Sequence, residues 1–276
     1  MTPTELAAEL RMTPKALRSW LRVEFPRSSS DEGARWDLKP AQVAAARDRF
    51  RRRPPTTSRD TQRVVGSSAT VPDSFPTRLQ DFLAAPMFTR EEVLASPCPV
   101  PQQAGVYGWW FSRVPGKIRS DGCVWRDHSC LLYTGISPKR PPANGRPPST
   151  QSLRARIKYH LTGNAEGSTL RKTLGSLLSG ELDIELRRVG SGSRMTFVEG
   201  ERALSAWMSE HARVSWIVDG SPWLLEAQII SNVDVPLNLD GNKHNAFYPE
   251  LVDLRAKAVA RARALPVIPN RGVGGR

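Results

Sequence analysis

The chain has 276 residues, of which 39% are hydrophobic, and 40 Lys and Arg against 27 Asp and Glu give a net charge of +13. This length suits two domains with packed cores. No apolar run reaches the roughly 18–20 residues that cross a bilayer, and the N-terminus lacks the pattern of a secretory signal. We therefore expect a soluble, cytoplasmic protein with no membrane partner. Its charge favours a polyanionic partner, nucleic acid first.

Residues 1–53 form the first predicted domain, a helix-turn-helix-like DNA-binding module. Thr2-Pro3 and Thr13-Pro14 each provide a helix start with proline at the first position, and two short helices so close together are typical of this motif. Pro40 begins a third helix. Three cations share the outer face of the second helix, where they would contact DNA phosphates: Lys15, Arg18 and Arg22. The alternative is a small helical adaptor with a solvated basic face.

The next segments are a linker and the start of the second domain. Residues 54–74 are rich in Pro, Thr, Ser and Arg without a hydrophobic period, which predicts a flexible linker. The second domain is predicted over residues 75–264. It opens with two short helices, the second marked by a capping box from Thr89 to Glu92. Residues 265–276 are predicted to be a flexible tail.

Two short apolar runs of the second domain carry tyrosines beside glycines. Gly105-Val106-Tyr107 opens the first run, and Tyr133-Thr134-Gly135 closes the second. β-Branched and aromatic runs bounded by glycine predict strands. Neighbouring strands would bring two phenols to one sheet edge, where they can exchange a proton or hydrogen-bond a phosphate. The alternative is that both tyrosines only pack.

The cysteines do not predict a disulfide framework. Cys98, Cys123 and Cys130 are few and odd in number. Together with His128 they offer three sulfurs and one nitrogen, a ligand set that zinc accepts. Their spacing matches no C-x-x-C knuckle, so the sequence favours buried or free thiols, with zinc as the alternative.

A basic segment follows the second tyrosine. Between Pro138 and Lys172 the chain has eight Lys or Arg and one acidic residue. This excess of positive charge predicts a surface that contacts the nucleic-acid backbone. The predicted contacts are Lys139, Arg140, Arg154, Lys158, Arg171 and Lys172. Within the segment, the period of Ser152–His160 predicts a helix with Arg156 and His160 on one face.

The remaining elements alternate between helix and strand. Helices are predicted at Ser168–Leu178, at Met195–His211, from Pro222 and at Pro249–Ala264, with strands at Asp183–Val189 and Val214–Val218. The helix from Pro222 contains Glu226 within an apolar stretch. A carboxylate there is costly unless it is paired or binds a cation. The alternative is a glutamate at the solvent edge of its helix.

Five of these elements together resemble the GIY-YIG endonuclease family. In chain order they are Gly105-Val106-Tyr107, Tyr133-Thr134-Gly135, Leu153-x-x-Arg156-x-x-x-His160, Glu226 and Asn238. The likeness covers about residues 105–242 and is greatest to the type II restriction enzymes of the family. Val and Thr replace two isoleucines of the family triplets. The interval between the triplets is also longer than usual, so an insertion at residues 112–130 must loop out.

The resemblance implies a fold and an activity. The fold is α+β, with a small, mainly antiparallel three-stranded sheet flanked by helices. Its strands would lie near 105–111, 130–135 and 213–218, with 183–189 as an added edge or hairpin strand. The implied activity is hydrolysis of double-stranded DNA with one divalent cation, Mg²⁺, for which Mn²⁺ could substitute. The implied catalytic residues are Tyr107, Tyr133, Arg156, His160, Glu226 and Asn238, with Glu226 as the metal ligand.

The implied roles leave one chemical difficulty. Arg156 would bind the scissile phosphate, and Tyr107 would position or deprotonate the attacking water. A phenol with a pKa near 10 is a poor base at neutral pH, so Tyr107 needs a lowered pKa or a partner. His160 and Lys158 are the two candidate partners.

Two other functions fit part of the pattern. One is a non-catalytic DNA-binding regulator built on the nuclease fold, and the other is an RNA-directed nuclease. Double-strand cleavage would suggest a homodimer, although one active site could also cut the two strands in sequence.

Overall fold

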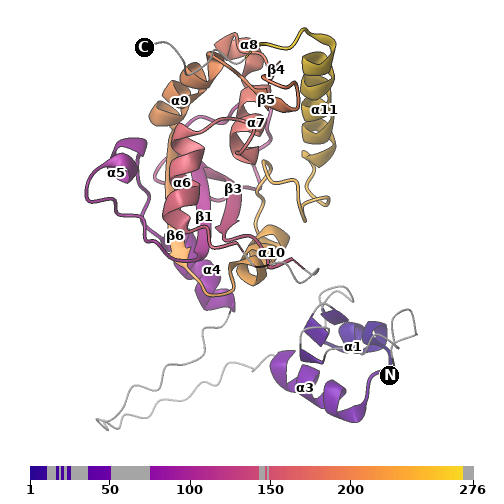
Figure 1. The fold of residues 1–276 in the computed structure, drawn as a ribbon. Helices are drawn as coiled ribbons and strands as arrows, with labels where there is room; N and C mark the ends of the chain where they lie inside the picture. Colours follow the sequence, from indigo (N-terminus) through magenta and orange to yellow (C-terminus); the bar gives the residue numbers. More distant parts are fainter. Residues whose placement is uncertain are drawn as a thin grey trace. The chain divides into compact units, whose positions relative to one another are not determined.

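The computed structural model of the chain describes residues 1–10, 17–18, 20–21, 24–25, 37–50, 75–142, 147 and 149–269. The chain divides into two compact units, Met1–Ala69 and Thr70–Arg276 (Figure 1). The predicted linker, residues 54–74, lies outside the described residues, as do Lys15 and Arg22 of the predicted DNA-contacting helix. Within the described ranges, no helix is long and apolar enough to cross a membrane.

The first unit contains α1 (Pro3–Glu9) and α3 (Pro40–Phe50), both beginning at the predicted prolines. Thr2 caps α1 through a capping box with Glu5. Arg47 of α3 forms two hydrogen bonds of 2.7 and 2.9 Å with the Glu9 carboxylate and joins the two helices. The buried core is Leu6, Ala7, Leu17, Leu21, Leu38, Val43 and Ala46. Arg18 is half-buried. The helix-turn-helix itself remains a prediction.

The second unit is built on an antiparallel sheet of four strands. These are β1 (Gly105–Phe111), β2 (Trp125–Arg126), β3 (Ser129–Ser137) and β6 (Ala212–Val218). Their order is β2-β3-β1-β6, and all seven residues of the central strand β1 are buried. The three predicted strands are therefore present, and the small mainly antiparallel sheet is confirmed with one more strand than expected.

Helices cover both faces of this sheet. Those that contact the sheet are α4 (Phe75–Ala84), α6 (Leu153–Thr162), α9 (Gly200–His211) and α10 (Pro222–Asn232). The other helices described in this unit are α5 (Arg90–Leu94), α7 (Thr169–Leu177), α8 (Ser179–Leu182) and α11 (Tyr248–Ala264). Val106 and Trp110 of β1 point to one face and pack with residues of α4 and α10. Tyr107 and Trp109 point to the other face and pack with residues of α6, α7 and α9. The site residues lie on this second face.

A bulge in β3 decides where Tyr133 points. The register pairs Trp109 with Tyr133 and Trp110 with Leu131, so Leu132 is an extra residue in β3. Side chains normally alternate between the faces of a strand, and an extra residue shifts that alternation by one. As a result Tyr133, which is opposite Trp109, lies on the same face as Tyr107.

The fourth strand comes from the predicted insertion, residues 112–130. Its hairpin turns through Asp127 and His128, both with positive φ, as a two-residue type I′ turn requires. The Arg126 guanidinium donates to the carbonyls of Leu83 and Ala85 and lies 4.9 Å from the centre of the Trp110 ring. The insertion is thus attached to the end of α4 and to the sheet.

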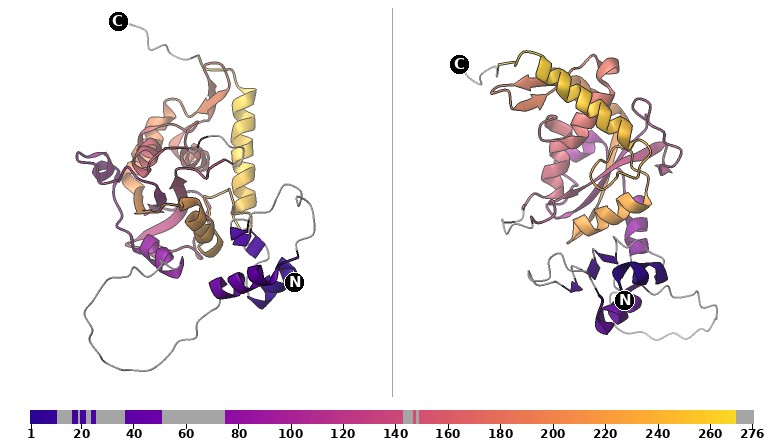
Figure 2. Two further views of the ribbon diagram at one scale, coloured as in Figure 1. Left: turned by 60° about the horizontal axis from the view of Figure 1, so that its bottom comes forward. Right: turned by 90° about the vertical axis from the view of Figure 1, so that its right-hand side faces the viewer.

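Two predicted elements begin later than expected. The strand predicted over Asp183–Val189 begins only at Arg187, because Asp183 caps the short helix α8. Arg194–Thr196 is strand β5, which pairs with β4 (Arg187–Val189) in a separate hairpin. The predicted helix from Met195 therefore starts only at Gly200, because Gly190 and Gly192 adopt positive φ and turn the chain back. Figure 2 shows α11 beside this hairpin.

The start of the predicted tail is also attached to this hairpin. Ile268 forms a backbone hydrogen bond of 2.9 Å with Arg188 and another of 2.9 Å with Gly190. Residues 265–269 are therefore held on β4, whereas the prediction made them the start of a flexible tail.

Asn238 fastens the segment after α10 to β3. Its side-chain oxygen accepts from the Thr134 amide at 2.9 Å, and its side-chain nitrogen donates to the Thr134 carbonyl at 2.8 Å. Asn238 is 5% exposed and Thr134 is fully buried. Both backbone groups between Tyr133 and Gly135 are therefore satisfied by one side chain.

We predict that Asn238→Ala lowers the free energy of unfolding by about 2–4 kcal/mol, because it leaves two buried backbone groups without a partner. Urea unfolding measures this loss. Asn232→Ala is the matched control, since Asn232 is exposed and its side chain donates only to the Gln228 carbonyl of its own helix. Equal losses in the two variants would contradict a special role for Asn238.

Candidate active site

The site begins with two buried phenols on one face of the sheet. Tyr107 is 1% exposed and Tyr133 is 8% exposed. Gly135 is opposite Tyr107 in the register, and a Cβ atom built on it would lie 2.5 Å from the Tyr107 hydroxyl. The second triplet therefore needs glycine at this position, because the Tyr107 phenol occupies the space of a side chain there.

Helix α6 places His160 against Tyr107. Ser152 caps the helix, and Leu153 and Ile157 bury the same side as His160. Gly105 leaves room for both neighbours of β1, since a Cβ there would lie 2.2 Å from the Ile217 carbonyl oxygen of β6 and 2.7 Å from the Leu153 side chain of α6. The Tyr107 hydroxyl and Nε2 of His160 are 2.8 Å apart, in full burial. Of the two candidate partners, His160 is therefore the one that contacts Tyr107.

Arg156 lies one turn before His160 on the same face. One of its terminal nitrogens donates to the Gly167 carbonyl at 2.9 Å, and the side chain is half-buried. Its positive charge is close enough to lower the pKa of Tyr107 against the effect of burial. The pair Arg156 and His160 thus has the geometry that its four-residue spacing predicts.

Burial dominates the protonation of these groups. It raises the pKa of Tyr107 to about 12 and raises the pKa of Tyr133 well above 10. Burial, with the charges of Arg156 and Arg171, holds the pKa of His160 well below its usual range. At neutral pH both phenols are therefore protonated and the imidazole is uncharged.

Glu226 contributes a carboxylate from α10. Burial, and then the negative charge of Asp240, raise its pKa to about 7, with Arg140 acting in the opposite direction. Among the described residues, no hydrogen bond or ion pair involves this carboxylate, and the charges that act on its pKa are those of Asp240 and Arg140. An unpaired, half-buried carboxylate suits a hard cation such as Mg²⁺, whose other ligands are usually waters and phosphate oxygens.

Asn238 remains near the site through its contact with β3. It holds the backbone of Thr134, the residue after Tyr133, and so fixes the strand that carries this phenol. Both hydrogen bonds of its side chain are to the Thr134 backbone, and its predicted role of orienting groups around the site stays a prediction.

Most predicted DNA contacts are accessible. Lys139 and Arg140 are exposed, and Arg154, Lys158 and Lys172 are half-buried. The Arg154 side chain also donates to the Val100 carbonyl at 2.6 Å. These five residues come from three successive parts of the chain, which are the segment after β3, α6 and α7.

Arg171 is not available to DNA, and its predicted role is wrong. Its side chain is fully buried and forms an ion pair of 2.7 Å with Glu201. Its guanidinium also donates to the His160 carbonyl and to Ser205. A count of local charge cannot separate a buried, paired arginine from an exposed one.

Three residues near the site were not predicted from the sequence. Asp240 and Arg255 are charged neighbours of Tyr133, and Arg255 of α11 donates to Thr173 at 3.3 Å. Ser168 is hydrogen-bonded to His160. In the sequence only Asp240 has a signal, since it lies two residues after Asn238, whereas Arg255 and Ser168 lie outside the five family elements.

The structure gives no support to the zinc alternative at Cys98, Cys123, Cys130 and His128. Among the residues that the structure describes, no three His, Cys, Asp or Glu side chains gather as metal ligands would. Cys98 donates to the Val93 carbonyl at 3.1 Å. The neighbouring Cys130 and burial raise the pKa of the Cys123 thiol, and all three cysteines are free.

Comparison with known families agrees with this geometry. The family model described as the GIY-YIG catalytic domain matches residues 105–257, which is more than half of the chain. Comparisons with curated proteins and with solved structures gave no match. The matched range contains both tyrosine triplets, the helix with Arg156 and His160, Glu226 and Asn238. The chain therefore belongs to the GIY-YIG family and has a nuclease-type catalytic domain.

Proposed function

We propose that the protein is a DNA endonuclease, restriction-like or DNA-processing, that hydrolyses phosphodiester bonds with one divalent cation. The observation that carries this proposal is the buried contact of Tyr107 with His160, with Arg156 one turn away. A phenol fixed by an imidazole beside an arginine offers proton exchange and phosphate binding at one place.

The residues would divide the work of hydrolysis. Arg156 binds the scissile phosphate and opposes the negative charge that builds up in the transition state. Tyr107 orients the attacking water, with His160 fixing the phenol. Tyr133 hydrogen-bonds a phosphate oxygen from the same face of the sheet. Asn238 maintains the β3 backbone that carries Tyr133.

The proposed cation is Mg²⁺, with Mn²⁺ as a substitute, and Glu226 would hold it. A bound divalent cation supplies positive charge to the phosphate and makes a water easier to deprotonate. Glu226 is suited to this role because its carboxylate has no protein cation in contact among the described residues. A buried carboxylate without a positive partner is costly, and a bound cation would offset that cost for Glu226.

The proposed substrate is double-stranded DNA. Lys139 and Arg140 are exposed next to the site, and the charge of Arg140 already acts on Glu226. The N-terminal unit would add affinity through its cations. A homodimer would place two such sites on the two strands, as closed two-fold symmetry allows.

The proposal is tested directly by Glu226→Gln, which we expect to abolish cleavage of plasmid DNA in Mg²⁺ while DNA binding stays within a few fold. Cleavage at more than about a tenth of the wild-type rate would exclude Glu226 as the cation ligand, since removing an essential group typically costs 10²-fold or more. An RNA substrate in parallel separates DNA from RNA cleavage.

The raised pKa of Glu226 also predicts a pH dependence of cation affinity. Because this pKa is about 7, the carboxyl is increasingly protonated, and hence uncharged, as the pH falls below 7. The Mg²⁺ concentration for half-maximal cleavage should therefore rise by about tenfold per pH unit below 7 and level off above it. Mg²⁺ titrations at pH 6, 7 and 8 measure this. A half-maximal concentration that does not change between pH 6 and 8 would contradict the assignment.

Arg156→Ala should slow single-turnover cleavage by roughly a hundredfold, because one transition-state donor typically contributes about 3–4 kcal/mol. Lys158→Ala is the matched control: it removes a cation from the same helix, two residues and about 200° away. It should weaken DNA binding and leave the rate at saturating enzyme within a few fold. The reverse pattern would mean that Lys158, and not Arg156, faces the phosphate.

Deletion of residues 1–53 should weaken DNA binding and flatten its salt dependence. Each phosphate contact contributes about −0.9 to the slope of log affinity against log salt. Cleavage at low salt should survive, because the catalytic residues all belong to the second compact unit. An unchanged slope, measured by fluorescence anisotropy, would show that the N-terminal unit does not contact DNA.

A further inference from the structure

His160 is held by hydrogen bonds at both ring nitrogens. Nε2 lies 2.8 Å from the Tyr107 hydroxyl, and Nδ1 lies 2.7 Å from the Ser168 hydroxyl. A neutral imidazole has one N–H donor and one acceptor nitrogen. The two contacts are therefore coupled: when one nitrogen donates, the other must accept.

Ser168 limits the choice between the two tautomers. Its hydroxyl oxygen caps α7 and accepts from the Arg171 amide at 3.1 Å. Ser168 is fully buried, so its hydroxyl proton needs an acceptor. Among the described residues, Nδ1 of His160 is the partner of that hydroxyl that can accept. Donation from Nδ1 instead would leave the Ser168 hydroxyl proton unsatisfied, which is costly. The Tyr107 hydroxyl is not limited in this way, because it also has the Tyr133 hydroxyl as a hydrogen-bonding neighbour.

If the imidazole were protonated, both ring nitrogens would donate and the two contacts would no longer be coupled. The surroundings of His160 oppose this protonation. Arg171 donates to the His160 carbonyl at 3.2 Å, and Arg156 lies one turn away on α6. Both positive charges and full burial lower the pKa of His160. No described carboxylate contacts the ring, so the uncharged form with one N–H is the relevant one.

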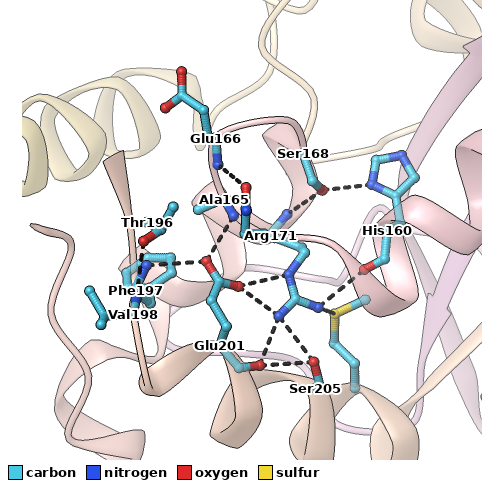
Figure 3. A network of polar contacts seen from close by, with 12 residues as sticks. His160, Ala165, Glu166, Ser168, Arg171, Thr196, Phe197, Val198, Glu201 and Ser205 are labelled. Carbon is cyan, nitrogen blue, oxygen red and sulfur yellow. Dashed lines mark hydrogen bonds and ion pairs between the residues drawn. The ribbon is translucent and has the colours of Figure 1, made fainter. Parts of the chain in front are cut away.

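The position of Ser168 is itself fixed by a buried ion pair (Figure 3). Arg171 donates through Nε and one terminal nitrogen to one Glu201 oxygen, at 2.9 and 2.7 Å. The other Glu201 oxygen accepts from the amides of Ala165 and Phe197 at 2.8 and 3.1 Å. The pair thus joins the end of α6, the start of α7 and α9 around Ser168.

We propose that Ser168 is a positioning residue that donates to Nδ1 of His160 and so keeps the proton on Nε2, from which His160 donates to the Tyr107 oxygen. This inference rests on the proposed nuclease function for its catalytic meaning, but not for the tautomer itself. The Arg171–Glu201 pair holds the serine and the histidine in place.

The Nε2 proton changes what Tyr107 can do. A donor aimed at the phenolic oxygen stabilises negative charge there and leaves another lone pair for the attacking water. The opposite tautomer would direct an imidazole lone pair at the same oxygen. The serine therefore acts on Tyr107 through the histidine, without touching substrate.

The tautomer is measured by long-range ¹H–¹⁵N NMR of the full chain labelled at histidine. The chain has four histidines, and the signals of the other three can be assigned with His128→Gln, His211→Gln and His244→Gln. We expect His160 to carry its proton on Nε2, with an unprotonated Nδ1. A spectrum with the proton on Nδ1 overturns the proposal. This result does not depend on whether the protein cleaves DNA.

Kinetics of two cap variants test the consequence. Ser168→Ala should slow single-turnover cleavage by about tenfold, the effect of roughly one hydrogen bond, and shift the NMR signal toward the Nδ1 tautomer. Ser168→Thr, which keeps the hydroxyl, should retain the wild-type tautomer. Ser152→Ala is the matched control, because Ser152 caps α6 in the same way but does not contact His160.

Three outcomes separate the explanations. Equal slowing by Ser168→Ala and Ser152→Ala would reduce Ser168 to a helix cap and overturn its positioning role. An Nε2 proton that persists in Ser168→Ala would also overturn it. A wild-type protein with the Nε2 proton but no cleavage of any DNA would refute the proposed function and leave the tautomer assignment standing. If Ser168→Ala does not fold, the wild-type and Ser168→Thr spectra still show which nitrogen of His160 carries the proton, and a proton on Nδ1 overturns the proposal.

Discussion

The hydrogen bond between Tyr107 and His160 is the contact on which the rest of the site depends, because it joins the central strand to α6. Glycine is required on both sides of it. Gly105 lets β6 and α6 approach the strand, and Gly135 leaves room for the phenol. Asn238 then fixes the neighbouring strand, and Ser168 fixes the far side of the imidazole. Residues spread over most of the second unit thus serve one buried contact.

Burial creates an electrostatic problem that the protein alone does not solve. It keeps both phenols protonated and His160 uncharged, so the resting site holds no strong base. The ionisable groups able to change this, Arg156 and Glu226, are only half-buried. Substrate phosphate and a cation would enter at this edge and add the charges that favour ionisation of a phenol or a water. A buried, neutral site completed by charged ligands is consistent with the nuclease function we propose.

The sequence predicts the parts of this arrangement that depend on local patterns. It does not predict the parts that depend on contacts between distant segments. The glycine-bounded strands and the four-residue spacing of Arg156 and His160 are local patterns, and the family prediction built on them is confirmed. The shared face of the two tyrosines is not local, because it depends on the bulge at Leu132. Arg171 was misplaced for a related reason: its burial depends on Glu201, which comes from a different helix.

The Arg171–Glu201 pair also shows what a buried charge can contribute. Removing two ions from water is expensive, and apolar residues of similar size often give equal or greater stability. This pair, however, binds backbone groups from three segments, including the carbonyl of His160 itself. Apolar side chains could fill the same volume but could not direct these groups. The pair is therefore better understood as a device for orientation than for stability: the distance between His160 and Tyr107 requires the end of α6 to be fixed, and directional hydrogen bonds fix it more closely than packing does.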